Sequence, residues 1–309
     1  MKNISFKSKK ADKNVNLDVF EDINDLVNYL KTAPTNRIFS GRTLHSQKAS
    51  DGDSSFHDFN TYDEALSSLE YGFDKYFIEF ENCLKKTKDY ISKMKANKTG
   101  NFKNDVIGFV PIVPNAINGI PVNMINQNTK KKPIPTLRIF IERTVSCGVS
   151  VQDNTNFYSV VFALISLLEQ KNIRCEIWEC ESSKDCDEIY INKTKIKDCL
   201  QPINTYKLQF PIISSDMLRR IGFRLLETCR SLKTGGWHFG YGSPLREMTY
   251  YDLTDDGFPN EGMQEILGIS EEDIYIPSVQ TLDCCGENLE YILKAILDKT
   301  GFKKYVQLI

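Results

Sequence analysis

The sequence predicts an α/β fold of the Rossmannoid type, in which helices flank a central β-sheet, preceded by a mostly helical N-terminal region. Two segments, 137–142 and 173–178, alternate β-branched or aromatic residues with charges, a pattern typical of strands. Between them, apolar residues over 157–168 recur at helical spacing behind Asp153 and Asn154, which favour helix N-caps. Strand, helix and strand within about 40 residues form a βαβ unit, and its connection is expected to be right-handed.

The composition indicates a globular chain with no overall attraction to a membrane or to nucleic acid. The 309 residues suffice for a well-buried core, and 39 Lys and Arg against 41 Asp and Glu give a net charge of −2. The longest strongly apolar run, 160–168, is too short to span a bilayer, and residues 1–7 lack the apolar core of a signal peptide. Nine scattered cysteines favour reduced thiols. We therefore expect a cytoplasmic protein with no membrane partner.

The first part of the chain, 1–55, is expected to be partly disordered. Residues 1–20 are polar and basic, which is typical of a loosely ordered terminus. A short amphipathic helix is expected over 23–30, where the apolar residues share one face. From 37 to 58 the chain is rich in Ser, Gly, Asp and Lys with little periodicity, so we expect a loop there.

The next part, 56–133, is expected to be a helical and proline-rich region packed on the core. Thr61 followed by Glu64 is a capping-box pattern that opens a short helix. A longer helix with an apolar face is expected over 73–94. Prolines interrupt 106–135, so this segment is expected to be neither a long helix nor a central strand. Its apolar residues indicate that it nevertheless packs on the body.

The last part, 134–309, is expected to contain the α/β core. After the βαβ unit, 180–187 is expected to be a polar insertion, and a strand pair is expected around 189–191 and 206–212. No linker requires a second independent domain, so we expect a single compact unit. The elements expected next are a helix capped by Ser214 or Ser215, a glycine- and aromatic-rich loop over 234–242, a strand over 274–279 and a helix over 289–297.

An acidic residue and two hydroxyl residues alternate at the end of the first strand: Glu142, Thr144 and Ser146. Ligands bind at this end of the strands in open α/β sheets, and three converging oxygens suit a hard cation such as Mg²⁺. From about Leu137 to the C-terminus the chain resembles the von Willebrand factor A fold, whose metal-ion-dependent adhesion motif is Asp-x-Ser-x-Ser at this position. Glu142 replaces the aspartate and Thr144 the first serine, so the motif is degenerate.

The longer side chain of Glu142 moves the carboxylate by about one methylene, which disturbs the near-ideal octahedral geometry that Mg²⁺ requires. We therefore expect no cofactor, and a strand-to-helix turn in which Ser and Thr make local hydrogen bonds. Mg²⁺ binding is the alternative. Cys147 precedes a helix whose N-terminus favours the thiolate, but the sequence shows no histidine partner for it.

A broader resemblance spans nearly the whole chain from about residue 56. The βαβ unit and the segments 59–65, 108–111, 119–124 and 218–223 carry it. In these segments the chain is similar to an uncharacterised family of phage and bacterial proteins, which has no established activity. The resemblance implies a phage-encoded protein that acts in the host cytoplasm, where its expected partner is a host or phage protein.

A second candidate binding surface combines Arg219 and Arg220 with the aromatic residues Trp237, His238 and Tyr241. Aromatic rings between glycines can stack on bases while arginines bind phosphate, which is how nucleic acids are held without sequence preference. The alternative is a packed glycine-aromatic turn beside helix-surface arginines, and the acidic segments nearby favour it.

No complete catalytic constellation is evident. Three histidines are too few and too scattered for a zinc site or a triad, and no phosphate-binding or dinucleotide motif is present. The expected function is a non-enzymatic protein-interaction module of phage type that binds a partner near the carboxyl ends of its strands. A nucleic-acid-binding accessory protein and an enzyme with an unrecognised site are the alternatives.

Overall fold

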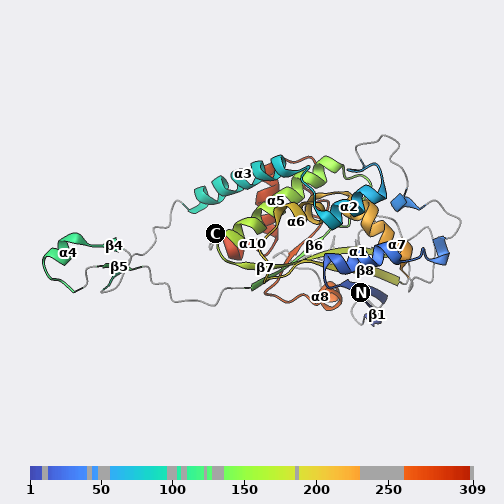
Figure 1. The fold of residues 1–309 in the computed structure, drawn as a ribbon, viewed down its shortest axis with the longest axis horizontal. Helices are drawn as coiled ribbons and strands as arrows, with labels where there is room; N and C mark the ends of the chain where they lie inside the picture. The colour runs from blue at the N-terminus through green and yellow to red at the C-terminus, as the bar shows by residue number, and fades with distance from the viewer. Residues whose placement is uncertain are drawn as a thin grey trace.

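The protein is built on a six-stranded mixed β-sheet with helices on both faces, as the computed structural model shows (Figure 1). The strand order is β1-β2-β8-β7-β6-β9, and a separate three-stranded sheet has the order β3-β5-β4. The predicted α/β class is therefore confirmed. The structure describes residues 1–8, 13–39, 44–47, 56–95, 103–105, 110–121, 124–126, 136–184, 188–229 and 261–306.

The predicted βαβ unit lies near the centre of the main sheet. It consists of β6 (Thr136–Glu142), α5 (Val151–Gln170) and β7 (Arg174–Lys184). The two strands pair in parallel, with Ile139 opposite Ile177. Both of these side chains are fully buried against the helices, which is why their strands can be recognised from their β-branched residues.

The helix α5 is buried on almost every side, which explains its nearly continuous apolar sequence. One side faces the sheet, and α3 (Phe77–Lys95) packs on another, where the ring centres of Phe80 and Phe162 lie 4.5 Å apart. The predicted N-cap residues, Asp153 and Asn154, lie inside the first turn of the helix. The N-cap is Ser150, whose hydroxyl accepts a hydrogen bond from the Asp153 N–H at 3.1 Å.

The strands β7 and β8 (Glu188–Lys197) form a long antiparallel pair. The strand expected around 189–191 is confirmed. The polar insertion expected over 180–187 is instead mostly strand, because β7 continues to Lys184 and buries Cys180. Its polar residues point into the interior, which conceals the alternation that marks a half-buried strand.

The N-terminal residues form two strands, so the expectation that 1–20 is loosely ordered is wrong. β1 (Lys2–Ser8) pairs antiparallel with β2 (Lys13–Phe20), and β2 runs parallel to β8 with Leu17 opposite Ile191. The alternation is visible in β2, but the Lys- and Asn-rich composition obscured it. The buried side chains of one face of β2 are Val15, Leu17 and Val19.

The expected strand over 206–212 is a helix, α6 (Thr205–Ile213). Asn204 caps it, because its side-chain oxygen accepts a hydrogen bond from the Lys207 N–H at 3.1 Å. Short apolar runs do not distinguish a buried strand from a buried helix by periodicity, which is why the prediction failed.

The helix expected to be capped by Ser214 or Ser215 exists, but its N-cap is Asp216, and Ser214 ends α6 instead. It begins as a π-helix (Met217–Gly222) before continuing as α7 (Phe223–Thr228). The whole π-helix is buried, its two arginines included. Helical segments of this kind are rare and occur frequently at functional sites.

The remaining predicted helices and the last strand are confirmed. The Thr61 capping box is complete, with both reciprocal hydrogen bonds present. Figure 1 shows α3, α5 and α6 on one face of the sheet and α8 on the other. None of the helices in the described ranges is long and apolar enough to cross a membrane. The further elements are α1 (Ile23–Thr32), α2 (Tyr62–Tyr71), α8 (Glu261–Leu267), β9 (Ile274–Ile276), α9 (Leu289–Lys299) and α10 (Phe302–Val306), with 3₁₀ turns at Arg37–Phe39 and His45–Gln47.

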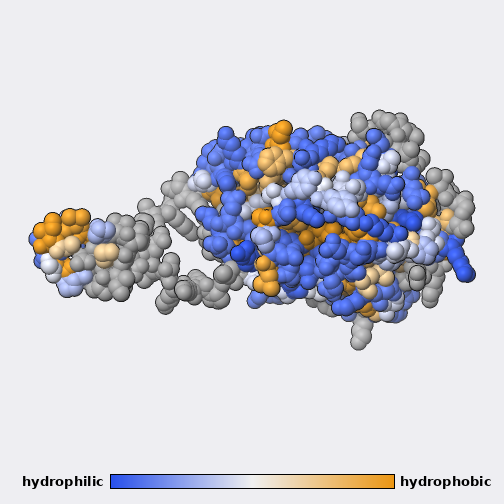
Figure 2. Space-filling model, viewed as in Figure 1, coloured by the Kyte–Doolittle hydropathy of each residue, from blue (hydrophilic) through white to orange (hydrophobic). Residues whose placement is uncertain are grey.

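The proline-rich segment carries the small sheet, which Figure 1 draws apart from the main body. As predicted, its described residues, 110–121 and 124–126, contain neither a long helix nor a central strand. Its helix exposes Val113 and Ile117, and Figure 2 shows apolar side chains at this end of the molecule. Its elements are β3 (Lys103–Asp105), β4 (Val110–Pro111), α4 (Val113–Ile117) and β5 (Met124–Asn126).

Candidate functional site

Two residues of the predicted metal motif are buried and tie the end of β6 to β7. Glu142 Oε1 accepts hydrogen bonds from the Thr144 N–H at 3.1 Å and from Ser182 Oγ at 3.2 Å. The Thr144 hydroxyl donates to the Ser182 carbonyl at 3.1 Å and accepts from the Ser182 N–H at 2.7 Å. Ser146 is half-buried, and its N–H donates to Gln280 Oε1 at 2.8 Å. The hydroxyl of Thr144 is therefore already engaged in joining two strands.

Burial also changes the acidity of Glu142. It raises the pKa of this carboxyl to about 7, although the hydrogen bonds from Thr144 and Ser182 partly oppose the rise. The second oxygen, Oε2, has no hydrogen-bond partner in the described part of the chain. Burial therefore favours the protonated form of this carboxyl.

Arg219 and Arg220, expected at a binding surface, lie in the interior, each with at most 1% of its side chain exposed. Arg219 donates to the carbonyl oxygens of Phe56 and Val149, and its guanidinium lies 4.1 Å from the centre of the Phe56 ring. Arg220 donates to the Phe59 carbonyl at 2.7 Å. Helical spacing could not show this, because the π-helix that carries both arginines is covered on every side.

The remaining predicted binding residues, Trp237, His238 and Tyr241, lie outside the residues that the structure describes.

Burial lowers the pKa of Arg219 to about 10, with the nearby carboxylates of Asp216 and Asp58 partly offsetting the effect. The guanidinium thus remains charged at neutral pH but faces backbone carbonyls inside the protein.

A polar network that the sequence did not reveal holds the segment around His57 and Asp58 to the π-helix. His57 Nδ1 lies 2.6 Å from Asp216 Oδ1, and the Asp58 N–H donates to Asp216 Oδ2 at 2.9 Å. Asp58 Oδ2 in turn accepts from Ser214 Oγ at 2.7 Å and from the Ser215 N–H at 2.8 Å. These partners are more than 150 residues apart in the chain, so no local pattern could have indicated them.

In its contact with His57, Asp216 resembles the carboxylate that orients a general-base histidine in an active site. The hydrogen bonds of the described residues give His57 no serine, threonine or cysteine partner that it would activate. Cys147 is exposed on the loop after β6. The network is therefore best explained as a clamp between distant segments.

A ladder of polar side chains fills the space between β7, β8 and the π-helix. Glu179, Glu181 and Ser183 lie on one face of β7, opposite Thr194, Asn192 and Tyr190 of β8, and we refer to these six residues as the polar ladder. Each of them is at least nine-tenths buried. Asn192 Nδ2 donates to Glu181 Oε2 at 2.6 Å. A buried sheet face with two carboxyl groups is unusual, because charged groups are seldom buried without a partner.

Burial and mutual repulsion keep this pair of carboxyl groups from ionising together. The pKa of Glu179 is raised well above its usual range by burial and by the charge of Glu181. Burial raises the pKa of Glu181 to about 8, although its hydrogen bond with Asn192 opposes the rise. The charge of Arg143 lowers both pKa values, but its guanidinium donates to the carbonyl of Ile212 at 2.6 Å.

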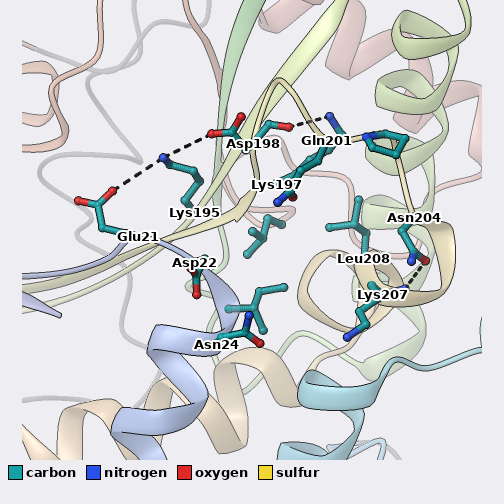
Figure 3. Close-up of a pocket in the computed structure, with 13 residues that line it drawn as sticks. Glu21, Asp22, Asn24, Lys195, Lys197, Asp198, Gln201, Asn204, Lys207 and Leu208 are labelled. Atoms are coloured by element: carbon teal, nitrogen blue, oxygen red, sulfur yellow. Dashed lines mark hydrogen bonds and ion pairs between the residues drawn. The ribbon is translucent and has the colours of Figure 1, made fainter.

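The pocket drawn in Figure 3 lies elsewhere, at the carboxyl ends of β2 and β8 and between the first turns of α1 and α6. Its volume is about 520 Å³. Figure 3 shows Lys195 between Glu21 and Asp198, and its Nζ lies 3.8 Å from a carboxylate oxygen of each. Lys197 turns inward and donates to Glu169 Oε1 at 2.7 Å. The charges of this polar pocket are thus largely balanced by one another.

A groove lies on the other side of the first turns of α6, and we call it the α6 groove. It has a volume of about 480 Å³ and is lined by Asp74, Phe77, Ile78, Thr205, Tyr206 and Gln209. The apolar side chains of its rim are unusually exposed, with Ile78 at 72% and Phe77 and Tyr206 at 48% each. Gln209 is fully buried at its base, and neither its Oε1 nor its Nε2 has a hydrogen-bond partner in the described part of the chain.

Contacts between Tyr206 and the residues after α2 hold α6 in place beside the groove. The ring of Tyr206 lies against Gly72, where a Cβ would stand 2.2 Å from two ring atoms, and the φ of +110° at this position also favours glycine. The Phe73 N–H donates to the Tyr206 carbonyl at 3.0 Å, which fixes α6 against the end of α2. Tyr71, next to this contact, is 65% exposed. The groove is therefore held by backbone contacts, while its aromatic side chains face solvent.

One comparison with known proteins gives a result. A family model described as Domain of unknown function (DUF7192) matches residues 5–303, which is nearly the whole chain. Neither a curated protein nor a solved structure matches the chain significantly.

Proposed function

The chain belongs to the family described as Domain of unknown function (DUF7192), and we propose that it is a non-enzymatic protein-interaction module that docks a partner protein in the α6 groove. The proposal rests on the chemistry of the groove itself. The family description assigns no activity that would argue for or against it.

Exposed apolar side chains gather around this groove. Single exposed apolar residues are common on protein surfaces, but a contiguous group marks an interaction site. Three of the large exposed side chains line the groove and a fourth, Tyr71, adjoins it. Tyrosine and phenylalanine are also enriched at the centres of protein interfaces, where they supply large contact areas.

The unpaired amide of Gln209 is the observation that carries the proposal. A buried amide without partners costs about 1–3 kcal/mol of stability. Both amide atoms are closed to solvent in the free chain, so they pair with a partner when the Gln209 side chain turns toward the groove. The amide offers one acceptor, Oε1, and one donor group, Nε2, side by side. The main chain of a protein partner offers the complementary pair, one N–H and one C=O.

The polar pocket lies on the opposite side of α6 from the groove. Asn204 and Lys207 line the polar pocket, whereas Thr205, Tyr206 and Gln209 line the groove, so successive residues of one helix serve both. The two hollows therefore open on different sides of the helix, and the docking proposal concerns the α6 groove alone.

Side chains that could act in catalysis instead make structural hydrogen bonds inside the protein. Glu142 joins β6 to β7, and Asp216 and His57 clamp a distant segment to the π-helix. This favours an interaction role over an enzyme with an unrecognised site. The docking site proposed here lies beside α6, while the space after β6, where the sequence directed attention, is filled by packed side chains such as Arg143 and Arg219.

Two finer points belong to the same proposal. We propose that the βαβ unit with β8 and β9 is a von Willebrand A-like core in which Glu142, Thr144 and Ser146 are a structural remnant of an adhesion motif and hold no Mg²⁺. We also propose that the protein is phage-encoded and meets a host or phage protein in the host cytoplasm. The nucleic-acid alternative now depends on Trp237, His238 and Tyr241, because Arg219 and Arg220 are buried.

Site-specific crosslinking tests the docking proposal. A photoreactive amino acid is placed at Ile78 in the groove and, as a control, at Tyr291 on α9, which is 41% exposed. We expect one discrete crosslinked partner from position 78 in host cells and none of that species from position 291. Equal crosslinking from both positions, or none from position 78, would contradict the proposal.

A further inference from the structure

The segment between α3 and β6 exposes a group of apolar side chains. We call residues 96–135 the arm, and Figure 1 draws its helix α4 apart from the main body. Val113, Ile117 and Ile120 are exposed, Ile117 the most at 78%, and we call these three residues the arm tip. Val113 and Ile117 share one face of α4, because they are four residues apart. The Ile120 N–H donates to the Asn115 carbonyl at 2.9 Å, which holds the following turn against α4.

The arm lacks a core of its own. Its strands are two or three residues long. None of its described residues, 103–105, 110–121 and 124–126, belongs to a hydrophobic cluster of the protein. A small sheet needs a hydrophobic face or a packed helix for independent stability. The arm tip is therefore suited to packing on another surface.

The α6 groove is the matching surface. More than half of the large exposed apolar side chains among the described residues belong to the arm tip or to the groove, which is lined by Phe77, Ile78 and Tyr206. Apolar grooves commonly receive short helical segments through the apolar face of the helix. Each chain thus carries one apolar groove and one helical segment with an apolar face.

The charges around the two surfaces are opposite. Residues 96–135 hold five lysines against one aspartate. Asp74 lines the groove, and Glu79 and Glu81 are exposed at the same end of α3. Lys75, beside Asp74 in the sequence, is paired with a buried aspartate. A basic segment with an apolar tip therefore complements an apolar groove with acidic neighbours.

We propose that the arm tip of one copy docks in the α6 groove of a second copy, so that two copies exchange arms in a dimer. This inference rests on the proposed docking function of the groove and names its partner. The groove lies at the N-terminal end of α3, whereas the arm follows the C-terminal end, and this helix of 19 residues is about 28 Å long. A second copy therefore supplies the tip, and a two-fold axis pairs both tips with both grooves.

Sedimentation velocity of the full chain at micromolar concentration tests the proposal, and we expect a dimer. Ile117→Asp in the arm tip and Ile78→Asp in the groove should each weaken self-association at least about tenfold, because each places a charge in the apolar contact. Both positions are exposed, so both variants should fold. Leu200→Asp, at a position that is 90% exposed and outside both surfaces, should leave the dimer unchanged. A monomeric wild-type chain would overturn the proposal.

Mixing the two variants distinguishes arm exchange from other dimers. The Ile117→Asp chain keeps an intact groove and the Ile78→Asp chain keeps an intact arm tip, so together they can form one contact between arm and groove. We expect the mixture to form a heterodimer, although neither variant self-associates. Loss of the dimer in only one variant, or no heterodimer in the mixture, would show that arm and groove do not meet.

Crosslinking from position 78 in host cells separates this inference from the docking proposal. A crosslinked species made of two copies of this chain supports both. A different protein in the crosslinked species, together with a monomeric purified chain, overturns arm exchange and leaves docking in the groove intact. The absence of any crosslinked species contradicts both.

Discussion

Gly222 of the π-helix lies directly on the carboxylate of Glu181: a Cβ at position 222 would stand 1.9 Å from Glu181 Oε2. The contact explains why a residue of low helix propensity occurs inside a buried helical stretch. It also joins the two unusual features of this interior, the π-helix and the polar ladder, at a single point.

Gly222→Ala should therefore destabilise the protein strongly. The new methyl group must displace the Glu181 side chain or the π-helix, and overpacking of this kind costs about 1–3 kcal/mol or more. Gly148→Ala is a matched control, because a Cβ there meets only Ser146 Oγ at 3.6 Å, an ordinary contact. Denaturant unfolding of both variants measures the loss of stability. Equal losses in the two variants would show that Gly222 does not lie against Glu181.

Glu142 should make stability depend on pH. Its pKa is raised from 4.5 in the unfolded chain to about 7 in the folded one. The folded state therefore holds the proton more tightly, and this stabilisation is present below about pH 4.5 and lost as pH rises through about 7. The loss is on the order of 3 kcal/mol.

The variant Glu142→Gln cannot titrate at this position and isolates the effect. The stability of the wild-type protein relative to the variant should fall as pH rises from about 4.5 to about 7. Glu179 and Glu181 titrate in both proteins, so to first order they cancel in the difference. A difference that is constant with pH would mean that Glu142 is not buried as described.

Leu164 on α5 is fully buried between the sheet and the outer helices. Leu164→Ala should cost about 2–5 kcal/mol, because it removes buried methyl groups and leaves a cavity. Gln152→Ala, at an exposed position of the same helix, should change stability by less than about 0.5 kcal/mol. Urea unfolding distinguishes the two, and a loss below about 0.5 kcal/mol for Leu164→Ala would place α5 on the surface.

Arg219 should prove to be a structural residue. Arg219→Ala leaves the carbonyls of Phe56 and Val149 without their donor, at a cost of about 2–4 kcal/mol. Arg174→Ala, whose side chain is 41% exposed, should cost little. Fluorescence anisotropy with single-stranded DNA and RNA at low salt completes the test. Specific loss of nucleic-acid binding in a stably folded Arg219→Ala protein would restore the nucleic-acid alternative.

The sequence predicted the elements whose signals are local and periodic. The βαβ unit, α9 and the capping box at Thr61 all carry such signals within a few turns or one strand. β2 was missed although Val15, Leu17 and Val19 alternate, because polar neighbours dominated the composition of the N-terminus. The sequence predicts a strand where α6 lies, because a short apolar run fits both a buried strand and a buried helix.

The candidate sites depend on contacts between residues far apart in the chain, which no local pattern reveals. Phe77 and Ile78 meet Tyr206 and Gln209 in the α6 groove only after folding. Glu181 and Gly222 likewise come into contact only when the chain has folded. One local signal was available: aromatic and branched residues at 77, 78 and 206 lie on helices whose other faces already supply the core. Such surplus apolar residues favour an interaction surface.

The affinity of the partner for the Gln209→Leu variant tests the central claim most directly. Leucine fills a similar volume without a donor or acceptor, so the free protein should be as stable as the wild type or about 1 kcal/mol more stable. The account predicts that the crosslinked partner, once purified, binds this variant at least about tenfold more weakly in calorimetry, because its main-chain groups lose their partners in the groove. Unchanged affinity in a variant of undiminished stability would contradict the claim that Gln209 and the α6 groove dock the partner.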